Sequence, residues 1–328
     1  MVNERASSIL IVGYYIVDAN DTQTEPRPLG SGFSTEGMLG KNFRWLPGDT
    51  DAMRPYSFAA LFACAAILLG DFTPQWNKPV PPYRVVSNLH YVGTNYLASF
   101  LITTPKGHIL INPDYEQSVP LIRASVEKLG FRFADIKIIL ISHAHDDHAA
   151  GCALAKKLTG AKLMVMDADA AEIESGGAGD FQYHQHWTPV KVDRVLHDGD
   201  MVTLGGMTLV AHLTPGHTKG CTTWTMEIRE GGRQYHVVIV GSPNVNPGFQ
   251  LVNNKEYPEI AADFARTFEV LESLPCDVFL GAHGGYFDML TKLKRYPQDG
   301  PRVFIDPAGY KNFVAQAQQT FEQALQKQ

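Results

Sequence analysis

Lys137-Ile-Ile-Leu-Ile-Ser142 runs directly into His143-Ala-His145-Asp-Asp147-His148, so an unbroken apolar segment leads into a cluster of histidines and aspartates. The apolar segment predicts a fully buried strand, and the loop that follows such a strand is where α/β proteins place their sites. In extended backbone His143 and His145 point the same way, while Asp147 and His148 fall in the first turn of the next helix. Polar caps of a helix start would explain Asp147 but not three histidines. Three imidazoles and a carboxylate within six residues therefore predict a metal site, with zinc preferred.

Two further histidines follow predicted strands directly. His217 lies in Thr214-Pro-Gly-His217, after the strand Met207–Leu213, and His283 lies in Gly281-Ala-His283, after the strand Asp277–Leu280. Taken singly, each is equally well explained as an ordinary loop histidine. Together with the first cluster they give six ligands from three strand ends. Six protein ligands predict two metal sites with open positions, which is a catalytic arrangement, whereas a structural zinc needs four closed ligands.

The rest of residues 83–328 alternates short apolar runs with helical segments. This pattern predicts two sheets packed together and covered by helices. The expected strands are 90–94, 98–104, 108–112, 137–142, 162–166, 201–204, 207–213, 222–228, 236–240 and 277–280, and the expected helices are 119–129, 149–158, 260–274 and 310–325.

The combination His143-x-His145-x-Asp147-His148, His217 and His283 resembles the metallo-β-lactamase superfamily, from about Tyr83 to the C-terminus. The resemblance implies an αββα sandwich of two mixed β-sheets flanked by helices, with a site for two zinc ions at one edge. It implies that one zinc ion is held by His143, His145 and His217. The other would be held by Asp147, His148 and His283.

The branch of the superfamily is indicated by the end of the expected strand His236–Val240. Many of its hydrolases carry a metal-bridging Asp there, but here the sequence continues Gly241-Ser242. With His148 present and no thiolate at Ser242, the chain is similar to the third metallo-β-lactamase subclass. Some members bind substrate through a pair of serines and a tyrosine in the next segment. Here Ser242 is present and Asn244 and Phe249 take the other positions, so Ser242 and Asn244 are the expected substrate contacts.

The resemblance implies hydrolysis of the β-lactam ring of penicillins, cephalosporins and carbapenems. The reaction would use a metal-bridged hydroxide and no covalent intermediate, with Asp147 orienting the nucleophile and passing a proton. Of the relevant serines, Ser118, Ser142 and Ser242 start no Ser-x-x-Lys motif. Ser125 does, with Lys128, but both residues lie within the expected helix 119–129. Two alternatives stay open: another hydrolase of the same fold acting on a lactone or thioester, and a non-catalytic zinc-binding protein.

Composition excludes several other classes of protein. The 328 residues are 45% hydrophobic and 19% charged, which excludes global disorder, and the net charge is −6. An acidic chain without a basic run is a poor nucleic-acid binder. The four cysteines form no CxxC pair, and Cys221, close to His217, is expected to be a buried packing residue rather than a ligand. No apolar run reaches the roughly 18 to 20 residues of a membrane span, so no stable membrane span is expected.

The N-terminal part of the chain does not fit the expected domain. Residues 53–70 read as a signal peptide, because Met53-Arg54 precedes a 12-residue apolar run, Phe58–Leu69. The alternative is a buried helix of the folded domain. We therefore expect 1–52 to be an upstream extension and 71–328 to be the metallo-β-lactamase domain, located in the periplasm or secreted.

Overall fold

The structure is a computed structural model that describes residues 77–328. The predicted extension 1–52 and the predicted signal peptide 53–70 lie outside the described residues, as does the start of the predicted domain. Among the described residues, no helix is both long and apolar enough to cross a membrane.

Within residues 77–328, the first sheet has seven strands that lie side by side in the order of the sequence. Strands β1 to β4 pair antiparallel, whereas β4 to β7 pair parallel. Parallel neighbours need long crossovers, which helices supply. The strands are β1 (Tyr83–Val86), β2 (Leu89–Tyr91), β3 (Phe100–Thr104), β4 (Gly107–Ile111), β5 (Ile136–Leu140), β6 (Lys162–Met166) and β7 (Arg194–Leu196), and the crossover helices are α2 (Val119–Lys128), α4 (Cys152–Thr159) and α5 (Asp167–Ser175).

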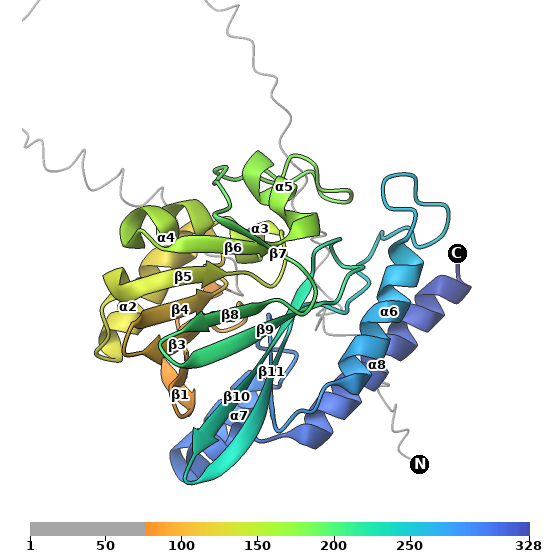
Figure 1. Ribbon diagram of the computed structural model, residues 1–328. Helices are drawn as coiled ribbons and strands as arrows, with labels where there is room; N and C mark the ends of the chain where they lie inside the picture. The colour runs from red at the N-terminus through yellow and green to blue at the C-terminus, as the bar shows by residue number, and fades with distance from the viewer. Residues whose placement is uncertain (1–76) are drawn as a thin grey trace, which may run out of the picture. The chain divides into compact units, whose positions relative to one another are not determined.

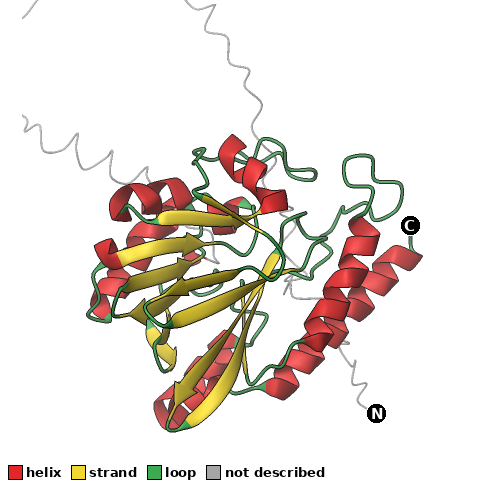
Figure 2. Cartoon of the chain, viewed as in Figure 1, coloured by secondary structure: helices red, strands yellow, loops and turns green. Residues whose placement is uncertain are grey.

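The second sheet in the described part of the chain has five strands in the order β12-β11-β10-β9-β8. Four strands form an antiparallel meander, and β12 adds parallel to β11 after helix α6. Both sheets are therefore mixed. Figure 2 shows the strands with helices on either side. The elements are β8 (Met201–Leu204), β9 (Met207–Leu213), β10 (Thr222–Glu230), β11 (Arg233–Val240), α6 (Ile260–Ser273) and β12 (Val278–Gly281).

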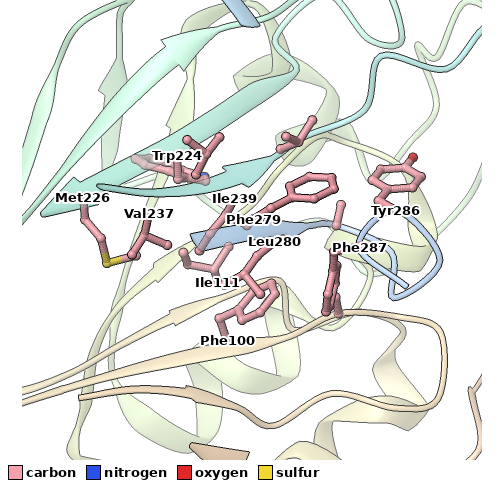
Figure 3. Packing of buried hydrophobic residues seen from close by; sticks show 14 of the residues in the cluster. Phe100, Ile111, Trp224, Met226, Val237, Ile239, Phe279, Leu280, Tyr286 and Phe287 are labelled. Atoms are coloured by element: carbon pink, nitrogen blue, oxygen red, sulfur yellow. The ribbon is translucent and has the colours of Figure 1, made fainter. Parts of the chain in front are cut away.

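Side-chain alternation along the strands divides the core into layers. Leu101, Leu110 and Ile139 point to the face of the first sheet that is covered by α2 and α4. Their neighbours Phe100 and Ile111 point the other way, toward the second sheet. Figure 3 shows these two side chains facing Trp224, Ile239 and other apolar residues of the second sheet. Period-two alternation thus buries both faces of the first sheet, which is what a sandwich requires.

Helices cover the outer face of the second sheet as well. Helices α6 and α8 (Pro307–Gln326) lie against each other beside this sheet (Figure 1), and Phe321 of α8 packs on Phe264 and Phe268 of α6 at centroid distances of 5.5 and 5.7 Å. The layer order is therefore helices, sheet, sheet, helices, and the predicted αββα sandwich is confirmed.

The structure corrects the predicted secondary structure in five places. The predicted helix 149–158 is two helices, α3 (Asp146–Ala149) and α4, because the Gly151 N–H donates to Asp114 O (2.7 Å) instead of continuing the helical ladder. The short strands β1 and β7 and the helices α5 and α7 (Met289–Asp299) were not predicted.

Candidate metal centre

Three strands bring the predicted ligands to one edge of the sandwich. In the second sheet β9, β11 and β12 run in the same direction, since β10 is antiparallel to β9 and β11 while β12 is parallel to β11. The end of β5 joins this edge, because the Thr222 N–H donates to Ser142 O (2.7 Å) and Trp224 Nε1 donates to Ile141 O (3.0 Å). The loops after β5, β9 and β12 therefore meet.

The first group of donors is His143, His145 and His217, whose candidate ligand atoms all lie within 4.8 Å of one another. All three rings are buried. The loop that carries His217 needs Gly216, whose φ is +120° and where a Cβ would lie 2.6 Å from the ring of Phe264. Glycine thus lets this loop pass close over α6 and turn its histidine inward.

The second group is Asp147, His148 and His283. His148 Nε2 lies 3.2 Å from His283 Nε2, and Asp147 Oδ2 lies 3.3 Å from the former and 3.6 Å from the latter. His143, Asp147 and His148 also form a compact set with atoms within 4.8 Å. The structure therefore brings together all six residues that the sequence predicted as ligands.

The spacing and protonation of these groups fit zinc. Ligand atoms about 2.0–2.1 Å from a tetrahedral ion stand about 3.3 Å from each other, close to the separations in the second group. The ring of His217 donates from Nδ1 to Asn244 O (2.8 Å), which leaves its Nε2 with a lone pair. His143 Nε2 is buried without a hydrogen-bond partner among the described residues. Burying an imidazole nitrogen without a partner costs free energy unless a metal ion accepts its lone pair.

Electrostatics keep most of the donors in the form that binds a metal. Burial, reinforced by neighbouring imidazoles, holds the pKa values of His143 and His217 well below the usual range and lowers the pKa of His283 to about 3. Burial raises the pKa of Asp147, but the adjacent His148 and His283 outweigh it, so this pKa falls below its ordinary value. Neutral imidazoles and an ionised carboxylate are the states that metal binding requires.

Two buried aspartates that the sequence did not single out support the first group. Asp169 accepts hydrogen bonds from Ala144 N (2.9 Å), Thr218 Oγ1 (2.8 Å) and Gly220 N (2.7 Å), so it ties the loop after β5 to the loop after β9. Asp180 Oδ2 lies 3.4 Å from His145 Nε2. Burial lowers the pKa of His145, but Asp180 outweighs it and the pKa rises.

The expected substrate contacts lie next to the second group, and their nearest partner is a tyrosine. Ser242 is only 1% exposed, and its Oγ lies 3.0 Å from Tyr286 Oη. Asn244 Nδ2 donates to the same Tyr286 Oη (3.0 Å), while its carbonyl orients His217. The ring of Tyr286 also packs on His283 at 5.1 Å. A substrate role for Ser242 and Asn244 stays a prediction.

Sequence reasoning missed Asp169, Asp180 and Tyr286 because none belongs to a motif with metal-ligand spacing. Tyr286 lies three residues after His283, which is its single local signal. The expectation for Cys221 is confirmed: it is fully buried and its backbone carbonyl and thiol bond neighbouring strands, with Ser242 N donating to its sulfur at 3.1 Å.

Comparisons with known proteins agree with this geometry. Residues 93–230 match the metallo-beta-lactamase superfamily. The native FEZ-1 metallo-beta-lactamase from Legionella gormanii is 54% identical, with a TM-score of 0.76 over 77% of this chain and 98% of that chain. The subclass B3 enzyme BJP-1 of Bradyrhizobium japonicum is 37% identical, with a TM-score of 0.73 over 77% and 97%.

A curated relative with a different name matches a smaller region. The hydroxyacylglutathione hydrolase of Rhodopseudomonas palustris (strain BisB5) is 29% identical over 119 residues, or 36% of this chain, and the match spans only 39% of that relative's length. The two metallo-beta-lactamase structures, by contrast, are matched over nearly their whole length. The chain therefore belongs to the metallo-β-lactamase superfamily of enzymes, and within it to the B3 branch that its sequence motifs resemble.

Proposed function

We propose that this enzyme opens the β-lactam ring of penicillins, cephalosporins and carbapenems, using two zinc ions. The observation that carries the proposal is the meeting of two three-donor groups at one sheet edge, with atoms spaced for tetrahedral metal binding. His143, His145 and His217 would hold one ion, and Asp147, His148 and His283 the other. Three protein ligands per ion leave positions open, which distinguishes a catalytic site from a structural one.

The protein's own groups have defined tasks in this proposal. Zinc, when bound, supplies Lewis acidity and brings the pKa of a bound water to about 7. Asp147 is the one carboxylate in the two donor groups, and its lowered pKa keeps it ionised and able to orient a water. Its proposed passing of a proton rests on its place beside both donor groups and not on that pKa. His217 is kept in one tautomer by Asn244 O.

Ser242 and Asn244 are proposed to bind the carboxylate that penicillins and cephalosporins carry. Because both side chains also bond Tyr286 Oη, the variant Ser242→Ala needs Tyr286→Phe as its control. A direct contact predicts that Ser242→Ala keeps two zinc ions and loses about 1.5–3 kcal/mol of transition-state binding. Tyr286→Phe should then cost clearly less. Equal losses in the two variants would instead assign Ser242 to the support of Tyr286.

Thioester hydrolysis is the second candidate, favoured by the name of the curated relative. The deciding experiment compares turnover of a penicillin, a cephalosporin, a carbapenem, a lactone and a glutathione thioester by the zinc-loaded protein, with and without a dipicolinate chelator. We expect β-lactam hydrolysis that the chelator abolishes and that clavulanate leaves intact. Thioester or lactone turnover far above that of every β-lactam would overturn the proposal, and two bound zinc ions without any hydrolysis would favour a non-catalytic zinc-binding protein.

We also propose export to the periplasm, with a role in antibiotic resistance. The support is the signal-like pattern of residues 53–70, since the enzyme would then meet β-lactams before they reach their targets. Expressed from Met53 in a Gram-negative host, the mature chain should begin between Ala66 and Trp76. Mass spectrometry of periplasmic protein checks this, and a chain that retains residues 53–70 would contradict it.

A further inference from the structure

The loop of residues 177–186, here called the rim loop, lies between α5 and β7 in the sequence. Its last residues come back close to its first ones. Its base is closed by the Trp187 N–H, which donates to Gly176 O at 2.8 Å. The indole ring of Trp187 lies so close to Gly177 that a Cβ there would come within 2.3 Å of it. The two ends of the loop are therefore fixed to each other, while its middle extends to the metal centre.

Two side chains from the middle of the rim loop meet the ligand His145. Asp180 Oδ2 lies 3.4 Å from His145 Nε2, and the ring of Tyr183 packs against the His145 ring with centroids 5.2 Å apart. Tyr183 Oη also accepts a hydrogen bond from Asn246 Nδ2 (2.8 Å), in the loop after β11. The position of the rim loop thus decides which groups surround one metal ligand.

The side chain of Gln185 adds two hydrogen bonds between this loop and the ligand-bearing segment. Gln185 Oε1 accepts from the backbone N–H of Asp146 (3.0 Å), and Gln185 Nε2 donates to Asp146 Oδ1 (3.0 Å). Asp146 stands between the ligands His145 and Asp147 in the sequence. Because a primary amide is both donor and acceptor, it can hold the backbone and the carboxylate of one residue at once.

We propose that Gln185 is a positioning residue that latches the rim loop over the metal centre through Asp146. Without this latch the loop stays anchored at its base, at Asn246 and through Phe181, which packs on Phe249 and Tyr257, but Asp180 and Tyr183 are held less firmly against His145. Zinc then dissociates faster, and the rim loop beside the metal centre is less ordered when substrate binds. The effect on substrate rests on the proposed β-lactamase function, whereas the effects on the loop and on zinc do not.

The test exchanges the amide of Gln185 and the carboxylate of Asp146 between the two positions. Gln185→Ala removes both hydrogen bonds, and Gln185→Glu sets two carboxylates against each other. Combining Gln185→Glu with Asp146→Asn restores a donor–acceptor pair in the reverse order, with the same total charge. Asp146→Asn alone keeps both bonds, because its amide oxygen still accepts from Gln185 Nε2. Gln319→Ala, at an exposed position on α8, is the control for loss of a glutamine.

Three measurements are made on zinc-loaded protein at one pH: amide hydrogen exchange of residues 177–186, the rate at which a chelator removes zinc, and KM and kcat for a cephalosporin. In Gln185→Ala and Gln185→Glu we expect exchange and zinc removal to rise about tenfold, as loss of one or two hydrogen bonds implies. KM should rise several-fold, with kcat changing less. The double variant Gln185→Glu with Asp146→Asn should return each measurement most of the way to its wild-type value. Asp146→Asn and Gln319→Ala should resemble the wild type.

Rim-loop exchange and zinc removal at wild-type rates in Gln185→Ala would overturn the latch. Faster exchange throughout β5 and β11 as well would also overturn it, since that pattern marks global destabilisation. The proposal would also fail if the double variant did not bring amide exchange of the rim loop back toward the wild-type rate. If the wild type hydrolyses no β-lactam, the proposed function fails, while exchange and zinc removal still decide the latch.

Discussion

At the scale of single residues, Asp180 shows how one carboxylate serves both a loop and a ligand. It accepts hydrogen bonds from the backbone N–H groups of Gln182 (2.9 Å) and Tyr183, and it lies beside His145 Nε2. A carboxylate in that place fixes which ring nitrogen of the histidine carries the proton and makes the other a better donor to a metal.

Replacing Asp180 by Asn separates these two roles, because an amide oxygen still accepts from the backbone N–H groups but carries no charge. We expect Asp180→Asn to lower zinc affinity about 10-fold to 100-fold, the usual effect of losing such a partner. Competition with a zinc-responsive chelating dye measures it. Asp180→Ala, which also loses the loop contacts, should be weaker still; an Asn variant that binds zinc as tightly as wild type would remove the carboxylate from this role.

Asp147 is expected to matter more than any other carboxylate in the centre. Asp147→Ala removes a candidate ligand and the group proposed to orient the water, so turnover of a cephalosporin should fall by well over tenfold. Metal analysis should return closer to one zinc ion than two. A turnover near the wild-type rate, with two ions retained, would take Asp147 out of the mechanism.

At the scale of elements, the first sheet carries two nearly buried histidines, on β2 and β4, that both contact one phenylalanine ring. His90 of β2 and His108 of β4 contact Phe131 at centroid distances of 5.2 and 5.3 Å, and each is 8% exposed. Burial, with Arg84 and His108 nearby, lowers the pKa of His90 to about 4. Burial also lowers the pKa of His108. Both imidazoles are thus held neutral in the fold.

This depression of the pKa makes the fold sensitive to acid. The unfolded chain takes up a proton on His90 near pH 6.5, whereas the folded chain does so only near pH 4. The contribution of neutral His90 to the free energy of unfolding is therefore fully present above about pH 6.5 and is lost as the pH falls toward 4. Allowing for the solvent that still reaches His90, His90→Phe should reduce the loss of stability between pH 7.5 and 5 by about 1 kcal/mol. Urea unfolding with chelator present checks this, and an unchanged pH dependence would contradict it.

The packing of α8 on α6 predicts a larger effect that is independent of pH. Phe321 is 5% exposed and packs on two phenylalanines of α6, so Phe321→Ala should cost about 3–5 kcal/mol of unfolding free energy. Phe321→Leu fills most of the space and should cost clearly less. Urea titration of the two variants measures the difference; similar costs for both would mean that the ring makes no specific contact.

Elements could be predicted from the sequence where a periodic pattern is long and apolar, as in β5, β9, α6 and α8. The six candidate ligands were found because each follows such a strand. Strand β7 was missed because its three residues include the exposed Arg194 and Val195, and its pairing with β6 depends on tertiary contacts. Gln185 and Asp180 lie in a loop whose conformation no short-range pattern specifies.

At the scale of the whole molecule, the candidate metal centre joins the two sheets. Four of its donors come from the segment after β5 in the first sheet, and His217 and His283 follow strands of the second. An ion that binds the folded chain alone stabilises it by RT ln(1 + [L]/Kd), or about 4 kcal/mol at a thousandfold excess over Kd.

Removal of metal should therefore lower the melting temperature of the whole domain. For a domain of this size about 4 kcal/mol corresponds to roughly 8–16 °C. Calorimetry of zinc-loaded protein with and without chelator measures the shift, and adding zinc back should reverse it. A melting temperature that chelation leaves unchanged would mean that the six side chains bind no stabilising ion.

The separation of the donors along the chain has a consequence for how the protein is made. His283 lies 135 residues after His148, and the strands of the first sheet pair in the order in which they are synthesised. The early loop can offer its donors while the second sheet is still missing, but a complete set exists only after β12 has joined β11. If the six donors bind metal as proposed, full metal loading would be a late step of biogenesis. Scarcity of zinc would shorten the lifetime of newly made molecules through proteolysis, as well as leaving finished ones idle.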